Sequence, residues 1–422
     1  MKLPEVEPIK ASHGDAWHAL LSLLSPGPEL ERLARTTGAL LRKRGVREAP
    51  DLLRVALSYG FCGLSFTGAA AWAHSNGSGK LSKSAVLRRF QKCGSWLEGL
   101  LASQLSAPLP DELVAGMRIR LVDATRVSAP GDKGRSWRIH AVYAPWERRL
   151  QQLQITDHKG GERLDRFAVQ SGDLIVGDRA YGGRRGVAHV VDGGGHFLVR
   201  STWNHLPLES LDGKPFDLFE AFRGLPEEGP ADFECRTVPD ARNGIPSVRC
   251  RVVATRKTAE AAEAAQKKIL AEAKKKGYQV DPRTLEACHY FFVVTSVPAQ
   301  TLTPEQVLTI YRLRWQIEIE FKRLKSLLNL DDLRSKQPAT VRAALAAKLL
   351  GAVCIEQLAA QFPDTQDHWT LTGLLKESLR QAILGQQAAT RWLQNTAEST
   401  TRLRGDSRRR IPQCNAARAL LA

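Results

Sequence analysis

The stretch YRLRWQIEIEFKRLKSLL, residues 311–328, combines helical periodicity with a concentration of aromatic, cationic and acidic side chains. A helix start signal precedes it. Thr303 is followed by Pro304, and Gln306 stands at the capping-box spacing from Thr303. These signals predict one continuous helix that begins at Pro304 and reaches about Leu328.

Four polar residues of this helix share one face, within an arc of about 60°. They are Tyr311, Arg314, Glu318 and Lys325. Glu320 falls on the opposite side. An apolar flank that could bury the helix against a sheet consists of Leu313, Ile317, Leu324 and Leu328. A salt-bridged surface helix would also space an arginine and a glutamate four residues apart, so the geometry alone leaves a structural and a functional interpretation open.

Two aspartates end apolar segments that have the composition of β-strands. Asp123 closes RIRLVD, and Asp178 closes DLIVGD. An ionised carboxylate at the end of a buried strand is costly unless it meets water or a cation. Together with Glu318, the two aspartates form a candidate trio of oxygen ligands for divalent cations. Asp173, at the start of the second segment, is expected to be a surface acid.

Residues 111–200 and 289–335 have the pattern of an α/β domain. Three short strands joined by turns come first, followed by helix, strand, helix and strand. The two helices are expected within residues 161–172 and 184–195. Residues 201–288 carry the further strand segments FECRTV and SVRCRVVATRK and an Ala-rich helix, so we predict a β-rich insertion that interrupts the core.

Residues 1–110 show helical periodicity. Within them, a small-residue helix, an Asn-Gly-Ser-Gly turn and a second, basic helix are compatible with a helix-turn-helix whose second helix contacts DNA. The second helix would begin after Ser82 or Ser84. Its candidate DNA-binding residues are Arg88, Arg89 and Lys92. A helical hairpin with solvated basic residues explains the same pattern, so both interpretations stay open.

The composition favours a polyanionic partner. The 422 residues include 61 Lys and Arg against 44 Asp and Glu, a net charge of +17, and nucleic acid is the commonest partner of such proteins. The seven cysteines show no C-x-x-C spacing, which argues against a zinc site and suits reduced thiols in a cytosol.

No membrane segment is expected. The N-terminus lacks an apolar signal core. Val55–Ala73 is uncharged and about as long as a membrane span, but its small and polar residues predict two short buried helices instead. Residues 336–422 are helical in pattern and contain the basic segment TRLRGDSRRR, which would either touch DNA or be solvated.

The spacing of the four residues on the helix face, Y-x2-R-x3-E-x6-K, resembles the YREK signature of bacterial insertion-sequence transposases of the IS-four (insertion sequence four) family. LVDATRV, around Asp123, resembles the first aspartate motif of that family, and IVGDRAYGG, around Asp178, resembles the second. The three motifs span about residues 115–330. Outside that range the resemblance is one of layout only.

This resemblance implies a ribonuclease-H-like fold with a DDE triad of Asp123, Asp178 and Glu318, in which the first and fourth strands are neighbours. It also implies the β-rich insertion before the helix that carries Glu318. The triad would hold two Mg²⁺ ions, for which Mn²⁺ would substitute, and would catalyse phosphoryl transfer on DNA.

Accessory roles follow from the same resemblance and from side-chain chemistry. Arg314 and Lys325 would bind backbone phosphate, and Tyr311 would donate its hydroxyl to a phosphate oxygen. Trp315 would be a stacking platform or would pack in the core. Trp203, in the insertion, is a candidate for stacking on a flipped base in a hairpin route.

The implied function is cut-and-paste DNA transposition, acting on terminal inverted repeats and target DNA in the bacterial cytoplasm, at the nucleoid. A homodimer on DNA is implied, with the helices after residue 336 as the contact. Two alternatives remain: a related metal-dependent nuclease that cuts without joining, and a decayed copy that binds DNA without chemistry.

Overall fold

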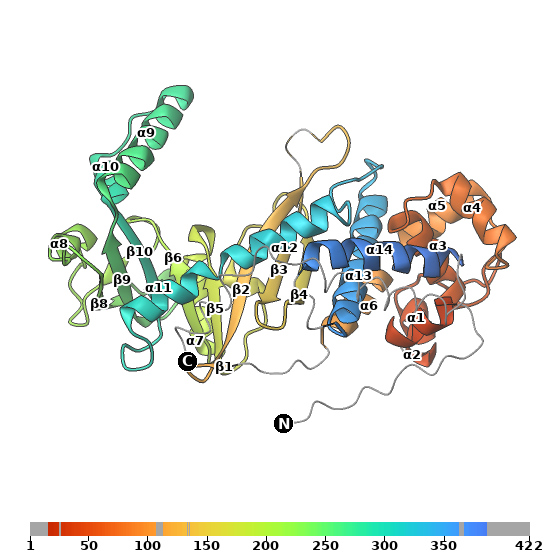
Figure 1. Ribbon diagram of the computed structural model, residues 1–422, viewed down its shortest axis with the longest axis horizontal. Coiled ribbons are helices and arrows are strands. Elements are labelled where there is room, and N and C mark those ends of the chain that lie inside the picture. The colour runs from red at the N-terminus through yellow and green to blue at the C-terminus, as the bar shows by residue number, and fades with distance from the viewer. Residues whose placement is uncertain are drawn as a thin grey trace.

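The computed structural model describes residues 16–24, 27–106, 113–132, 134, 136–362 and 367–385 (Figure 1). Within them the N-terminal part is helical, as predicted. Its helices are α1 (Ala16–Leu24), α2 (Gly27–Thr36), α3 (Ala49–Gly60), α4 (Phe66–Ser75), α5 (Lys83–Lys92) and α6 (Gly94–Leu105). The basic segment at residues 401–410 and Cys414 lie outside the described residues.

A ten-stranded mixed sheet runs through the middle of the described chain. Its core strands are β2 (Met117–Val127), β3 (Trp137–Ala144), β4 (Arg149–Thr156), β5 (Asp173–Gly177) and β6 (His196–Arg200), with β1 (Leu113–Val114) beside β2. Their order is β4-β3-β2-β5-β6. The first three are antiparallel, whereas β5 is parallel to both β2 and β6. The predicted meander of three strands is therefore confirmed.

The insertion continues this sheet. β10 (Tyr290–Thr295) pairs with β6, and β9 (Arg249–Arg256), β8 (Pro230–Thr237) and β7 (Leu208–Glu209) follow in that order. Its helices are α8 (Leu218–Arg223), α9 (Ala259–Lys276) and α10 (Pro282–Glu286). The predicted strands and the Ala-rich helix are both present, and α9 projects from the body (Figure 1).

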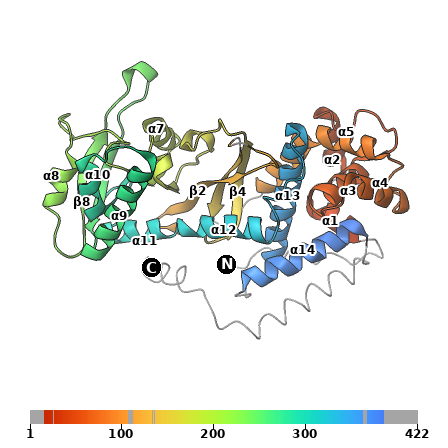
Figure 2. The same cartoon turned by 90° about the horizontal axis from the view of Figure 1, so that it is seen from above.

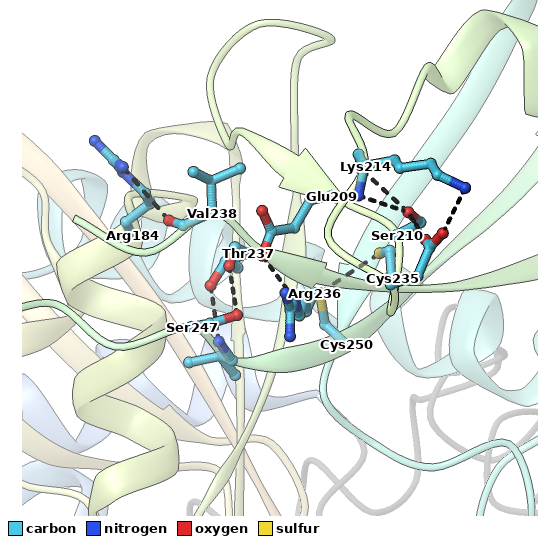
Figure 3. Close-up of polar contacts among 12 residues, drawn as sticks. Arg184, Glu209, Ser210, Lys214, Cys235, Arg236, Thr237, Val238, Ser247 and Cys250 are labelled. Carbon is cyan, nitrogen blue, oxygen red and sulfur yellow. Dashed lines mark hydrogen bonds and ion pairs between the residues drawn. The ribbon is translucent and has the colours of Figure 1, made fainter. Parts of the chain in front are cut away.

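Polar contacts join the insertion strands to one another and to the core (Figure 3). Arg236 on β8 bonds Glu209 on β7 at 2.6 Å, and Arg184 at the start of α7 (Arg184–Asp192) bonds Asp240 beyond β8 at 3.1 Å. Cys235 and Cys250 face each other across β8 and β9 with their sulfurs 3.6 Å apart. The cysteines within the described residues are free thiols, as the spacing predicted.

Helices cover both faces of the sheet (Figure 2). The elements concerned are α7 (Arg184–Asp192), α11 (Pro304–Arg312) and α12 (Trp315–Ser326). On one face Leu121 and Val176 pack in the same core as Ile317 of α12. On the other face Val199 packs in a second core with Val187 of α7. The side chains of β2, β5 and β6 therefore alternate between two apolar layers.

The helix predicted from Pro304 to about Leu328 is not continuous. α11 ends at Arg312 and α12 begins at Trp315. At the break, Arg314 N donates to Tyr311 O at 3.1 Å and Gln316 N donates to Leu313 O at 2.8 Å, the three-residue spacing of a tightened turn. The physical reason is packing, because α11 lies against β6, β8 and β9 whereas α12 lies against β2.

Two smaller predictions are also wrong. Residues 161–172 contain only the short 3-10 turn Leu164–Arg166 instead of a helix. Leu164 and Phe167 are buried in the core beneath α7, so this segment packs as an irregular layer while it crosses to β5. Asp173, expected at the surface, is 5% exposed and is ion-paired with Arg118 at 2.8 Å.

The last described helices pack against the first. α13 (Pro338–Ala359) contacts α3, α5 and α6, as well as α14 (His368–Leu384). By length and composition α13 could span a membrane, but 83% of its most apolar window is buried inside the protein. The uncharged segment Val55–Ala73 forms parts of α3 and α4 with a turn between them, as predicted.

Candidate active site

Asp123 and Asp178 lie beside each other on two parallel strands. Asp178 follows the end of β5, but Asp123 does not close its strand as predicted, because pairing with β3 extends β2 to Val127 and places Asp123 opposite Ala141. Leu121 on β2 pairs with Val176 on β5, and each aspartate follows its strand partner by two residues. Because side chains alternate along a strand, both aspartates point to the face that α11 and α12 cover. The sequence-based expectation that these strands are neighbours is thus met.

The carboxylate of Asp123 is in an unfavourable position for a free anion. Burial raises its pKa to about 7; the backbone N–H of Ala124, which donates at 2.7 Å, opposes this rise, and the Asp178 carboxylate adds to it. Arg314 opposes the rise and Glu162 contributes to it in smaller measure. A positive charge placed between the two aspartates would therefore favour the ionised form of Asp123.

Glu318 lies on the first turn of α12 and contacts Arg314, the residue directly before that helix. Arg314 donates to Glu318 at 2.7 Å, and both side chains are partly exposed. Burial alone would lower the pKa of Arg314, but Tyr311, Glu318 and Asp123 outweigh it and raise that pKa. Arg314 therefore stands between Glu318 and the aspartates, and connects the helix to the strand ends.

The other two members of the predicted face, Tyr311 and Lys325, differ in their exposure, and Trp315 lies beside them. Tyr311 is 8% exposed, and its ring packs against Phe291 of β10 at 5.7 Å between centroids. Burial raises the pKa of Tyr311, while Arg314 and Arg200 oppose that rise, so its hydroxyl lies within the field of both guanidiniums. Lys325 is partly exposed near the end of α12. Trp315 is 46% exposed with the Lys322 ammonium 5.2 Å from its ring, so it does not pack in the core.

Glu320 faces away from this site, as predicted. It is 2% exposed and forms an ion pair with Arg323. Burial raises the pKa of Glu320, and Arg323 opposes the rise. The two glutamates of α12 are therefore in different environments, one in the partly exposed site and one in the core.

Sequence reasoning missed a group of cations beside Asp178. Arg179 follows Asp178 directly, Arg200 ends β6 and Lys257 follows β9. Burial lowers the pKa of Arg200, and the nearby Arg179 lowers it further. Burial also lowers the pKa of Lys257, with both arginines adding to the effect. Within the described chain these three cations form no ion pair. The only local signal was Arg179, which stands inside the second aspartate motif.

These cations line a cavity of about 610 Å³, whose wall includes Arg179, Arg200, Trp203 and Lys257. Ligand sites are roughly 300–1,000 Å³ in volume, so the cavity is large enough for a nucleotide-sized group. The indole N–H of Trp203 donates to Thr284 at 3.1 Å. The cavity thus joins the end of the core sheet to the insertion and has cations at its wall.

The basic helix of the N-terminal part is present at the predicted place. α5 begins after Ser82, whose hydroxyl accepts from Ala85 N, and α4 and the turn precede it. Arg88 and Lys92 are exposed. Arg89 is partly buried because its guanidinium donates to the carbonyls of Arg42 and Arg44. The structure therefore places two of the three predicted cations at the surface and uses the third in an internal contact.

The oxygen donors on β2 and after β5 suit a hard divalent cation. Asp123 and Asp178 provide adjacent carboxylates, and the pKa of Asp123 is raised by burial first and by the Asp178 carboxylate in smaller measure. Among the residues that the structure describes, however, three acidic, histidine or cysteine side chains do not gather closely enough to form a complete site. Glu318 would have to exchange its contact with Arg314 for a shared cation.

Comparison with known proteins identifies the relatives of this chain. Residues 115–354 match the family model described as Transposase DDE domain. The assigned transposase InsL of insertion sequence element IS186A, from Escherichia coli (strain K12), is 36% identical over 349 residues, which cover 82% of this chain and 94% of the relative. The transposase for insertion sequence element IS421, from Escherichia coli, is 36% identical over 350 residues with the same coverage.

Proposed function

The chain belongs to the insertion-sequence transposases that carry a DDE domain, and from this premise we propose that Asp123, Asp178 and Glu318 are its catalytic carboxylates. The observation that carries the proposal is the register of β2 and β5, because it brings the two aspartates together beneath the helices that carry Glu318. The core, in this proposal, is a ribonuclease-H-like domain that residues 201–288 interrupt.

The three carboxylates would hold two Mg²⁺ ions, with Mn²⁺ as a substitute. Bound there, the ions would activate the attacking oxygen and stabilise the leaving oxygen of the phosphodiester. Arg314 contacts Glu318 at 2.7 Å, and Glu318 would exchange this contact for the shared cations. Arg314 also adds a positive charge that favours the ionised state of Asp123.

The reaction would cleave DNA at the ends of the element and join the freed 3′ ends to target DNA. Arg314 and Lys325 would bind backbone phosphate, and Tyr311 would donate its hydroxyl to a phosphate oxygen. Arg200 and Lys257, which are half-buried, and the exposed Arg179 support this assignment, because clustered cations without an acidic partner among the described residues favour a bound anion.

DNA contact would extend to both sides of the core. Trp203 and the cavity in the insertion would receive a base beside the cleaved strand, and Trp315 would stack at the exposed side of α12. Arg88 and Lys92 of α5 would contact the end sequence. Transposition of two ends calls for a dimer on DNA, in the nucleoid of a bacterial cell. α13 is an unsuitable contact because it is buried in its own chain.

Strand-mapping on element-end DNA tests this function. Purified full-length protein is incubated with the flanking terminal inverted repeats in Mg²⁺ or EDTA, and the 3′ ends are mapped on a sequencing gel. We expect metal-dependent cuts at the repeat edges that Asp123→Asn, Asp178→Asn and Glu318→Gln abolish while binding persists. A hairpin band would identify the route, and strand-transfer products would separate a transposase from a nuclease that only cuts. Binding without any cut would point to a decayed copy.

A further inference from the structure

A basic loop lies beside α5 in the N-terminal part. The loop is residues 42–47, with the sequence RKRGVR, and its four cations are exposed. Lys43 lies 3.9 Å from Glu31, a distant and exposed pair. Arg42, Arg44 and Arg47 form no ion pair with any acid among the described residues. The loop therefore presents positive charge that acids among the described residues do not compensate.

Two sets of contacts hold this loop on the helix-turn-helix. The Arg89 guanidinium of α5 donates to the carbonyls of Arg42, at 3.0 Å, and of Arg44. Lys80 N, in the turn between α4 and α5, donates to Gly45 O at 3.0 Å. A guanidinium that bonds two carbonyls of one loop fixes its backbone, so the cations project from a defined position relative to α5.

The turn approaches the loop too closely for a side chain. A Cβ placed on Gly79, whose φ is +155°, would lie 2.3 Å from Gly45 O. Such backbone-to-backbone packing is available only to glycine at this position. The two segments thus form one surface, although some thirty residues and the whole of α3 and α4 separate them in the sequence.

We propose that the loop of residues 42–47 is a second DNA-backbone contact, which Arg89 and Gly79 hold at a fixed offset from α5. The inference rests on the proposed function and names its DNA surface. α5 would enter a groove with Arg88 and Lys92, while Arg42, Arg44 and Arg47 bind phosphates of the flanking backbone. Arg89 is then a positioning residue and does not itself contact DNA.

Duplex DNA is the partner that fits this arrangement. A short loop of cations beside a basic helix matches a regular array of phosphates, and the rigid attachment lowers the entropy cost of binding. The surface carries three uncompensated arginines and no exposed aromatic side chain in residues 42–47, so base stacking is not expected there. The loop should contribute affinity and its salt dependence, and little sequence preference.

Salt-dependent binding of full-length protein to terminal-repeat duplex tests the proposal. The charge variant is Arg42→Gln, Arg44→Gln, Arg47→Gln combined. We expect the slope of log affinity against log salt to decrease by about 0.9 for each lost phosphate contact, and affinity to fall by about 10- to 100-fold. The discrimination between repeat and unrelated duplex should stay within about twofold of the wild type.

Two glycine variants test the effect of the loop's position on DNA binding without changing its charge. Gly79→Ala changes no charge but forces the turn away from the loop, so we expect a reduced slope and weaker binding. Gly77→Ala is the matched control: Gly77 also has a positive φ of 73°, but a Cβ there would meet nothing within 4 Å. Circular dichroism and thermal unfolding check that both variants are folded. Arg89→Gln removes the attachment of the loop, so its salt slope and affinity should resemble those of Gly79→Ala.

The outcomes are distinct. If wild type binds and cuts the repeats but the triple variant keeps the wild-type slope, the loop is not a DNA contact and the inference is wrong. If the triple variant loses slope while Gly79→Ala and Arg89→Gln match Gly77→Ala, the positioning part is wrong. If wild type neither binds nor cuts, the proposed function itself fails. If Gly79→Ala unfolds, the triple variant tests whether the charges of the loop bind DNA, and Arg89→Gln tests whether the position of the loop matters.

Discussion

At the scale of single residues, the two glutamates of α12 show how environment separates chemical roles. Glu318 is partly exposed beside Arg314, whereas Glu320, two residues later, is buried against Arg323. Both arginines compensate a carboxylate, but only Glu318 lies on the side of the helix that faces the strand ends. A partly exposed carboxylate can exchange partners at low cost, whereas a buried one loses its only compensation.

This contrast predicts opposite effects of two isosteric substitutions. Glu318→Gln should lower the metal-dependent cleavage rate by about 1,000-fold or more while the free energy of unfolding changes little. Glu320→Gln should leave the chemical step in place but lower the free energy of unfolding by about 2 kcal/mol, because Arg323 loses its charged partner in the core. Single-turnover cleavage and urea unfolding of both variants measure the two effects. Normal cleavage by Glu318→Gln would refute the assignment of the third carboxylate.

At the scale of elements, α12 is fixed from its far end by lysines of the last two helices. Lys348 of α13 donates to the carbonyls of Asn329 and, at 3.0 Å, of Asp332. Lys376 of α14 donates to Leu327 O at 2.5 Å. These carbonyls follow α12; that of Asn329 also accepts from Asp332 N at 3.0 Å. The C-terminal helices therefore hold the helix that carries Glu318 at a constant position over β2.

Substitution of these lysines should weaken that attachment unequally. Lys348→Met should lower the free energy of unfolding by about 2 kcal/mol and Lys376→Met by about 1 kcal/mol, since the former loses two buried acceptors and the latter one. Burial lowers the pKa of Lys348 to about 8. Between about pH 8 and the unfolded value of 10.5, the unfolded chain binds more protons, so wild-type stability should rise with pH.

Urea unfolding at pH 7.5 and pH 9.5 measures both effects. The rise with pH should be smaller in Lys348→Met. Burial also lowers the pKa of Lys376, so Lys376→Met should reduce the rise as well. An equal rise in all three proteins would show that another group causes it.

At the scale of the whole molecule, the first and last helices of the described chain form one helical body. α3 and α13 approach closely where glycine faces a neighbour. A Cβ on Gly60 would lie 2.5 Å from the Ala347 Cβ, and one on Gly351 would lie 2.3 Å from the Phe61 ring. The helices before the sheet and those after it therefore share a core, and α13 lies inside it. The boundaries of a DNA-end-binding domain at residues 1–110 and of a dimerisation region at residues 336–422 stay predictions.

Close packing of α3 on α13 predicts the effect of alanine at these sites. Gly351→Ala should lower the free energy of unfolding by about 1–3 kcal/mol through overpacking. Gly373→Ala, in the interior of α14 where a Cβ would meet nothing within 4 Å, is the control and should raise it by about 0.5–1 kcal/mol. Thermal and urea unfolding would measure both. Equal effects of the two substitutions would mean that α3 and α13 are not packed closely in solution.

Local chemistry was sufficient for several conclusions. The capping box at Thr303, the alternation in β2, β3 and β4 and the opposite orientation of Glu318 and Glu320 follow from spacing alone, because each depends on a few adjacent residues. The two aspartate motifs and the helix face predicted which acids to examine. The break at Leu313 and Arg314 could not be predicted from local spacing, because it arises where α11 and α12 pack on different strands.

By itself, the sequence determined most of the elements, the two aspartates and the helix face that carries Glu318. Periodicity and capping are encoded within a few residues, so they survive without knowledge of the fold. The family resemblance implied that the strands of Asp123 and Asp178 are neighbours. Only the tertiary structure decided that β2 continues past Asp123, and it brought Arg179, Arg200 and Lys257 to the same end of the sheet. It also placed residues 42–47 against α5. These contacts join segments far apart in the chain, and their energy depends on packing and burial that no local pattern contains.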